Sequence, residues 1–306
     1  MMMKKNLLAF LLILVVHCTW AQQDAMYSQY MFNYLAINPA YAGSRDVLGV
    51  TGLYRKQWIN VDGAPTTMTI TADAPIAHER MGVGLSVSND KIGIENNTGV
   101  YGTYAYRLRL SQKGTLSFGA SVGFTQYKAS LAGVNTNNTK FLDPAFASAV
   151  SEFNPNFGFG VYYTTDKFYL AASLPHILAS QLSSLQELDS RLKRHYFLGA
   201  GYVATINPSV KLKPSVLIKV VEGAPIQADI NLNVWLINRV GFGLSYRTGD
   251  SFAALAEFQI SPTFRFGYAY DLTTTRLGVY NSGSHELMLR YEFATNRKKI
   301  ITPRYF

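Results

Sequence analysis

The side chains that could do acid–base or metal chemistry are few and scattered along the chain. Beyond residue 21, none of the histidines stand at the HxH or HxxxH spacing that would bring two imidazoles to one metal ion: His78, His176, His195 and His285. Three further carboxylates stand alone in predicted loops: Asp143, Glu187 and Asp189. The sequence therefore predicts no metal site and no cofactor-binding site.

A nucleophilic serine is equally poorly supported. Ser180, Ser183 and Ser184 fall between apolar residues spaced as on one face of a short loop helix, not on the strand-to-helix turn of a nucleophile elbow. Four Gly-x-Gly pairs lack the loop-to-helix context of a phosphate site: Gly82/Gly84, Gly158/Gly160, Gly199/Gly201 and Gly241/Gly243. We interpret them as places where a sheet bends or another segment approaches closely. We predict no catalytic residue and no enzyme.

The remaining ionisable residues follow the alternation of predicted strands. Between residues 226 and 293, apolar and polar residues alternate five times, and the polar positions carry a set of charged or amide side chains: Arg247, Glu257, Gln259, Arg265, Asp271, Arg290 and Glu292. A period of two places these side chains on one face of a sheet and the Phe-rich and Tyr-rich set on the other. We expect Glu257, Asp271 and Glu292 to pair with Arg247, Arg265 and Arg290 across a polar lumen.

Alternating strands of about 9–11 residues joined by tight turns are typical of a transmembrane β-barrel, and favour it over a soluble sandwich. Fourteen such strands are predicted: about 47–57, 66–74, 81–89, 99–110, 115–128, 156–164, 167–174, 195–206, 209–220, 226–234, 240–247, 252–260, 264–270 and 287–293. The long connections 129–155, 175–194 and 272–284 all fall at one end. The predicted fold is all-β: a transmembrane antiparallel up-and-down barrel over residues 46–293, with short periplasmic turns and longer extracellular loops.

Composition and the start of the chain agree with a barrel. Charged residues are 15% and aromatic residues 13% of the chain. Lys4, Lys5 and the apolar run 7–16 resemble a signal peptide, with cleavage expected near Ala21. Cys18 would permit lipoprotein processing, but His17 does not match the small residue expected before it. Since Cys18 is the one cysteine, the processed chain would carry no disulfide and no thiol nucleophile.

The segment 22–45 is rich in aromatic residues but does not alternate, and turns such as Asn38-Pro39 punctuate it. We expect it to be either a plug inside the barrel or a periplasmic flap. At the other end, residues 294–306 form a basic and aromatic tail, predicted to be periplasmic. The formal charge of +9 arises largely from this tail and the leader, so nucleic-acid binding is not indicated.

Several runs resemble one family over essentially the whole chain after the leader. They are Gln29-Tyr30-Met31-Phe32-Asn33, Asn38-Pro39-Ala40-Tyr41-Ala42-Gly43, Arg55-Lys56-Gln57-Trp58 with Gly63-Ala64-Pro65, Ser284-His285-Glu286-Leu287-Met288-Leu289-Arg290-Tyr291, and Pro303-Arg304-Tyr305-Phe306. Together they resemble the PorP/SprF family of the outer membrane of Bacteroidota.

The resemblance implies a non-enzymatic outer-membrane barrel linked to type IX secretion and, in some species, to gliding motility. Such a protein would help to export or retain large cell-surface proteins, including adhesins, by docking their C-terminal sorting domains or the periplasmic machinery. The residues we expect to bind such partners lie at the two ends of the barrel: Arg55, Gln57, Lys298, Lys299, Arg304, Tyr305 and Phe306. The alternative function is a channel for small or hydrophobic solutes, in contact with outer-membrane lipid.

Overall fold

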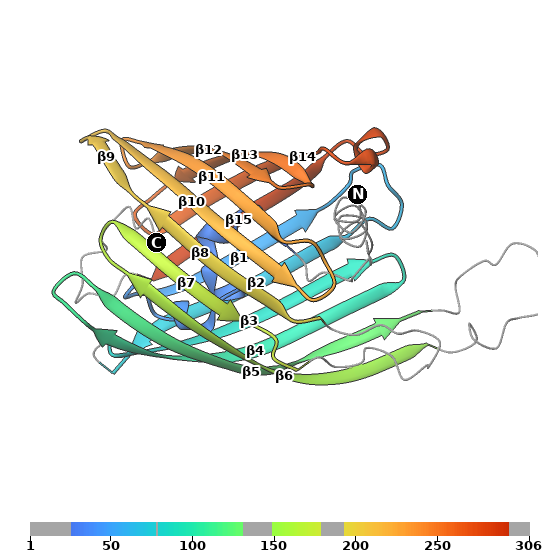
Figure 1. Cartoon of the computed structure of the whole chain (residues 1–306), viewed down its shortest axis with the longest axis horizontal. Coiled ribbons are helices and arrows are strands. Elements are labelled where there is room, and N and C mark those ends of the chain that lie inside the picture. Colours follow the sequence, from blue (N-terminus) through green and yellow to red (C-terminus); the bar gives the residue numbers. More distant parts are fainter. Residues whose placement is uncertain (1–25, 78, 131–148, 179–192, 294–306) are drawn as a thin grey trace, which may run out of the picture.

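In the computed structural model, residues 26–77, 79–130, 149–178 and 193–293 are described. Their strands form one antiparallel sheet that closes on itself, because β1 pairs with β15 and β10 pairs with both β8 and β11 (Figure 1). The strands are β1 Leu48–Lys56, β2 Thr66–Ile76, β3 Met81–Ile92, β4 Glu95–Arg109, β5 Thr115–Ala129, β6 Val150–Thr164, β7 Phe168–Leu174, β8 His195–Tyr202, β9 Ala204–Asn207, β10 Val210–Val221, β11 Gln227–Leu236, β12 Val240–Arg247, β13 Ser251–Gln259, β14 Phe264–Thr273 and β15 Ser284–Phe293.

Elements β8 and β9 together make one strand of the wall. Both pair with β10, and Val203 between them donates its N–H to the Lys167 carbonyl at 2.6 Å. This interruption falls inside the predicted strand 195–206. Counted in this way, the described residues form the closed barrel of fourteen strands that the sequence predicts.

The alternation of the sequence determines which side chains face out and which face in. Outward residues are apolar and largely exposed, as at Ile230, Leu232 and Leu244. Inward residues of the same strands, such as Asn231 and Ser245, are buried. With lipid outside, only the closed ladder can satisfy the backbone groups of the strands, and the polar inward face requires a filled or hydrated lumen.

The connections differ at the two ends of the barrel. Those of β5–β6, β7–β8 and β14–β15 all leave at one end, the right-hand end in Figure 1, and the last contains the 3-10 helix η6, Arg276–Val279. At the opposite end, connections such as residues 165–167 and 237–239 are tight turns. By the rule for outer-membrane barrels, the long-loop end is extracellular and the short-turn end is periplasmic.

Several predicted strands are too short: 81–89 extends to Ile92, 99–110 begins at Glu95, and 287–293 begins at Ser284, but the largest difference is in β6. The sequence analysis assigned 129–155 to a loop, yet β6 begins at Val150 and pairs with β5 from Ala129↔Val150 onward. Pro155 lies opposite Phe124, and β7 pairs with β6 only from Phe159. At Pro155, β6 therefore has no β7 partner within the described residues, and a proline is tolerated at an unpaired edge.

Among the described residues, no helix combines the length and apolar character needed to cross a membrane.

Candidate functional site: the segment inside the barrel

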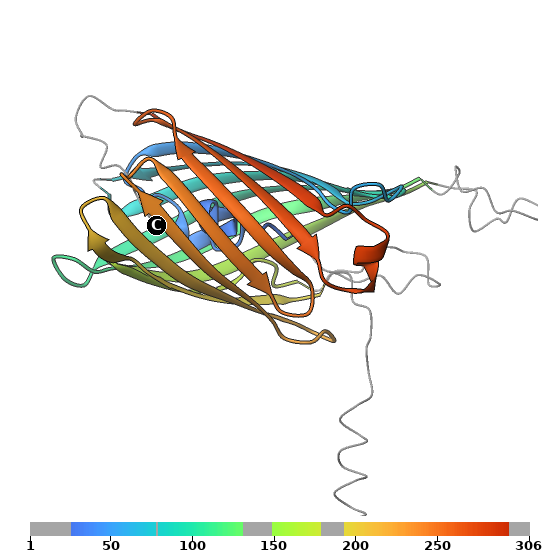
Figure 2. The same cartoon turned by 90° about the horizontal axis from the view of Figure 1, so that it is seen from above.

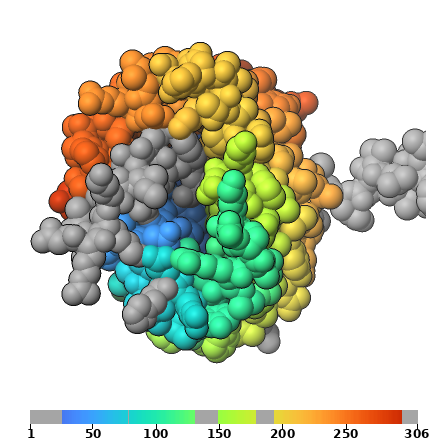
Figure 3. Space-filling view, turned by 90° about the vertical axis from the view of Figure 1, so that its left-hand side faces the viewer, coloured from blue at the N-terminus to red at the C-terminus, as the bar shows by residue number. Residues whose placement is uncertain are grey.

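Residues 26–45 lie inside the barrel, and we refer to them as the lumen segment. They appear in blue within the barrel in Figures 1 and 2, and Figure 3 shows blue atoms in the centre of the barrel seen from its short-turn end. Of the two placements considered from the sequence, plug or flap, this arrangement is a plug. Tyr30 is 1% exposed, and Gln29, Asn38 and Ala40 are fully buried.

The lumen segment folds as three short 3-10 helices: η1 Tyr30–Phe32, η2 Tyr34–Ala36 and η3 Pro39–Tyr41. Asn38 starts η3, because its Oδ1 accepts the Ala40 N–H at 2.9 Å, and Pro39 in the first turn has no N–H to satisfy. The Asn38 amide also donates to the Val161 carbonyl of β6 at 3.1 Å. One side chain thus fixes both the local turn and its position against the wall.

Tyrosines pack the middle of the lumen. Tyr34 lies against Tyr162 of β6 and Tyr169 of β7, with ring centroids 5.8 and 5.4 Å apart. Tyr41 also packs edge-on against Tyr162 at 5.5 Å. Burial raises the pKa of the Tyr30 and Tyr34 hydroxyls well above the usual value, so both stay neutral. Their aromatic surface anchors the lumen segment to the wall.

At the extracellular end, a buried carboxylate holds the start of the lumen segment. The two oxygens of Glu286 accept the backbone N–H groups of Ser28 and Gln29, each at 2.8 Å. The Arg55 guanidinium pairs with Glu286 at 2.9 Å and with Asp271 at 2.6 Å, and the Ser28 hydroxyl donates to Asp271 at 2.6 Å. This group of Arg55, Asp271 and Glu286, the upper ion cluster, compensates its buried charges internally.

At the periplasmic end, a second set of charges holds the exit of the lumen segment. Arg45 pairs with Glu292 of β15 at 2.7 Å, and Glu292 also pairs with Arg290 at 3.2 Å. Arg290 donates to the Phe32 carbonyl at 2.9 Å, and Asp73 accepts the Gly43 N–H at 2.9 Å. The lumen segment is therefore attached by charge-assisted bonds at both ends.

The predicted ion pairing is confirmed in part and corrected in part. Glu257 pairs with Arg265 at 2.8 Å and Glu292 with Arg290. Arg247, however, pairs with Asp229 at 2.9 Å, and Asp271 pairs with Arg55. Asp229 lies directly opposite Arg247 in the β11–β12 ladder, and the sequence prediction omitted it. Barrel closure pairs β1 with β15, next to β14, and so brings Arg55 to Asp271.

Wall glycines make room for the lumen segment. A Cβ at Gly82 of β3 would overlap the backbone of Ala42, and one at Gly119 of β5 would overlap Ala40. Close approach by another segment was the interpretation given to the Gly-x-Gly pairs, and it is confirmed at Gly82. At Gly241 and Gly243 the neighbours are instead Trp235 and Asn233 of the adjacent strand.

The predicted partner-binding residues are separated. Arg55 points into the lumen, 2% exposed, and belongs to the upper ion cluster. Half-buried Gln57 follows β1 and donates its N–H to the Pro65 carbonyl at 2.9 Å. Lys298, Lys299, Arg304, Tyr305 and Phe306 lie outside the described residues.

Sequence reasoning did not identify Ser28, Gln29 and Glu286 as a contact. Glu286 stands two residues before Met288, so the alternation of the strand places both side chains inside the barrel. An inward carboxylate at this position was the one sign in the sequence that a polar partner lies in the lumen. Its partners could not be identified because they stand more than 250 residues away in the chain.

Within the part of the chain that the structure describes, no group of three or more His, Cys, Asp or Glu side chains could hold a metal ion. Ion pairs among lumenal residues account for the arginines and acids of β12 to β15. The arrangement is that of a filled outer-membrane β-barrel.

Comparison with known proteins identifies the family of this barrel. The sequence profile described as "Type IX secretion system membrane protein PorP/SprF" matches residues 19–291. The chain belongs to this family and resides in the outer membrane. No match was found among curated proteins.

Solved structures with a similar fold are outer-membrane barrels. The CymD monoaromatic hydrocarbon channel is 11% identical, with a TM-score of 0.50, and the match covers 88% of this chain and 94% of that chain. A FadL homologue of Pseudomonas aeruginosa is 12% identical, with a TM-score of 0.45, over 87% of this chain and 94% of that chain. At these identities the likeness concerns the fold.

Proposed function

We propose that this chain is a non-enzymatic docking barrel of the type IX secretion machinery. In this role it helps to export or retain large surface proteins, either by binding their C-terminal sorting domains or by binding the machinery in the periplasm. The observation that carries the proposal is the lumen segment, bonded to the wall at both ends by Glu286 and Glu292. A barrel filled in this way offers its two ends, and not its interior, to large partners.

The extracellular end supplies the surface for a secreted client. On this side of the barrel, strands β4 to β6 have 15 residues each and are longer than β11 to β15. The strands that flank the predicted capture loops 129–155 and 175–194 end on this side, with residues 150–155 of the first belonging to β6. Binding residues are found most often on loops that a rigid scaffold holds in place, and the barrel wall is such a scaffold.

The periplasmic end supplies the second surface. Residues 294–306 follow β15, which ends at Phe293 on the short-turn side. Their Lys, Arg, Tyr and Phe side chains are suited to an acidic partner with an apolar patch. We propose this tail as a docking element for periplasmic components, and residues 1–21 as a signal peptide that is removed during export.

A solute channel is the alternative function. Conduction would require the lumen segment to leave contacts with strands around the barrel, among them Thr71 of β2, Val161 of β6, Asn231 of β11 and Glu286 of β15. Breaking these buried hydrogen bonds, together with the buried ion pair of Arg45 with Glu292, costs several kcal/mol. The resting protein should therefore conduct poorly in a planar bilayer.

The proposal is tested by affinity purification of the tagged full-length protein from detergent-solubilised outer membranes, followed by mass spectrometry. The expected result is co-purification of secretion-machine subunits or of a large protein with a C-terminal sorting domain. An unrelated outer-membrane barrel carrying the same tag is the control. A barrel without partners that also conducts steadily would favour the channel and contradict docking.

A further inference from the structure

A cavity of about 190 Å³ lies between the lumen segment and the inner faces of β2 to β5. The lumen segment bounds it with Tyr27 and residues 35–39, and the wall bounds it with β2, β3, β4 and β5. Ile92, Glu95 and Pro175, at the long-loop ends of their strands, also border it. The cavity therefore lies toward the extracellular end of the lumen.

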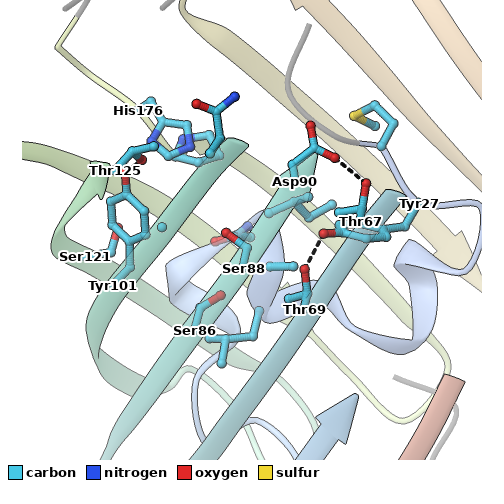
Figure 4. Close-up of a pocket in the computed structure, with 18 of the residues that line it drawn as sticks. Tyr27, Thr67, Thr69, Ser86, Ser88, Asp90, Tyr101, Ser121, Thr125 and His176 are labelled. Carbon is cyan, nitrogen blue, oxygen red and sulfur yellow. Dashed lines mark hydrogen bonds between the residues drawn. The ribbon is translucent and has the colours of Figure 1, made fainter. Parts of the chain in front are cut away.

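The wall of this cavity is lined by small hydroxyl side chains. They come from three neighbouring strands: Ser86 and Ser88 from β3, Thr103 from β4, and Ser121 and Thr125 from β5. In Figure 4, Tyr101, Ser121 and Thr125 lie on one side, Thr67 and Thr69 on the other, and Ser86 and Ser88 between them. Tyrosines fill the middle of the lumen, but here the wall leaves space beside groups that both donate and accept hydrogen bonds.

Some hydroxyls are already engaged and others face the cavity. Tyr101 and Thr125 share a hydrogen bond of 2.8 Å, Thr67 donates to Asp90 at 2.5 Å, and Tyr27 bonds to Thr69. The Asn97 side-chain oxygen is buried and has no hydrogen-bond partner among the described residues. An acceptor of this kind at a cavity wall is satisfied by a donor from a water molecule or a ligand.

The charges around the cavity are mixed. Asp90 and Glu95 are acidic and Lys193 is basic, so the border carries no field of one sign. This balance does not favour a phosphate or another strong anion. Aromatic surface lines the cavity as well: Tyr101 and His176 both border it and pack in a T-shaped arrangement, with centroids 5.2 Å apart.

We propose that this cavity binds one neutral saccharide or polyol unit that enters from the extracellular side. Such a ligand carries many hydroxyls that donate and accept, matching the serines and threonines, and an apolar C–H face suited to Tyr101. Pockets for drug-sized ligands span about 300–1,000 Å³, so the smaller cavity here accommodates a single ring. The sugar could be free or stand at the end of a surface glycan.

The test uses the full-length protein purified in a detergent without a sugar headgroup, because maltosides would compete. Saturation-transfer NMR and calorimetry would measure binding of methyl glucoside, galactose and N-acetylglucosamine. The triple substitution Ser86→Ala, Ser88→Ala and Ser121→Ala removes cavity hydroxyls and should weaken binding about tenfold or more. The matched control, Leu85→Ala, Val87→Ala and Val122→Ala, changes lipid-facing side chains of the same strands and should bind as the wild type does.

Thr103→Leu provides a second variant that fills the cavity with one apolar side chain, and it should abolish binding. Polysaccharide released from outer-membrane lipid distinguishes the sources: competition with the bound monosaccharide supports a glycan end, and no competition supports a free sugar. Failure of every sugar to bind the wild type would overturn the proposal. So would equal binding by the wild type, the serine triple variant and Thr103→Leu, or an equal loss in the serine triple variant and its lipid-facing control.

Discussion

At the scale of single residues, Glu286 holds the start of the lumen segment in place. It accepts two backbone N–H groups of the lumen segment and pairs with Arg55 inside the barrel wall. Its side chain is fully buried. Losing its charge leaves Arg55 with Asp271 as its remaining carboxylate partner and leaves one backbone donor poorly satisfied.

We therefore expect Glu286→Gln to destabilise the seated lumen segment by about 3 kcal/mol. A change of this size raises the fraction of barrels with a displaced segment about a hundredfold. The measurement is the frequency of open events in planar bilayers. Glu222→Gln makes the same chemical change in an exposed pair with Arg194 and should leave the frequency unchanged. Equal traces for the wild type and Glu286→Gln would contradict this role.

Gly119 permits the closest approach of the lumen segment to β5. Gly119→Ala would place a methyl group on the backbone of Ala40. We expect this overpacking to cost about 1–3 kcal/mol and to increase protease access to residues 26–45. Gly52→Ala is the control, because a Cβ there meets nothing within 4 Å. If both variants resist protease as the wild type does, the close contact of Gly119 with Ala40 is not needed to hold the lumen segment in place.

At the scale of elements, the lumen segment and the wall are separable. The wall closes through its own ladder, with β1 paired to β15 from Leu48↔Phe293 to Lys56↔His285. The lumen segment contributes no strand to this ladder. Its contacts are made by side chains and by backbone groups of its 3-10 turns.

Deleting residues 26–45 should therefore leave a barrel that still inserts and shows the heat-dependent electrophoretic shift of folded outer-membrane barrels. The freed lumen should fill with water and conduct ions steadily, because its wall carries charged side chains such as Arg247 and Glu257. Single-channel recording measures this. A deletion variant that inserts but stays silent would mean that something other than the lumen segment closes the barrel. A variant that fails to insert would show that the segment is part of the folding unit.

At the scale of the whole molecule, the two ends differ in their connections. The extracellular end carries long connections and the proposed sugar cavity, and the periplasmic end carries tight turns and the start of the basic tail. A barrel that is filled between these ends can hold partners on opposite sides of the membrane without letting solutes through.

Removing residues 295–306 should leave the barrel inserted but reduce recovery of periplasmic partners in the affinity purification. The physical reason is loss of the four cationic residues Arg297, Lys298, Lys299 and Arg304, with two aromatic side chains. Substituting these four with Gln retains the length of the tail and tests charge alone. If the shortened protein no longer reaches the outer membrane, the tail acts as an insertion signal instead.

The sequence by itself determined the wall of this protein. A period of two, tight turns and the common side of the long connections specified an antiparallel barrel of fourteen strands, because lipid outside and polar groups inside impose alternation on every strand. The polar face also indicated lumenal ion pairs such as Arg265 with Glu257. These features involve residues of the same strand or of strands that follow one another in the chain, so the local sequence pattern is enough to predict them.

Only the tertiary structure decided what lies in the lumen. The sequence left residues 22–45 open between a plug and a flap, since aromatic residues without period are compatible with either. It also paired Asp271 with the wrong set of arginines, because Arg55 comes beside it only when β1 closes on β15. Contacts such as Glu286 with Ser28 and Gln29 join residues from opposite ends of the chain, and a local sequence pattern does not predict contacts over such a separation.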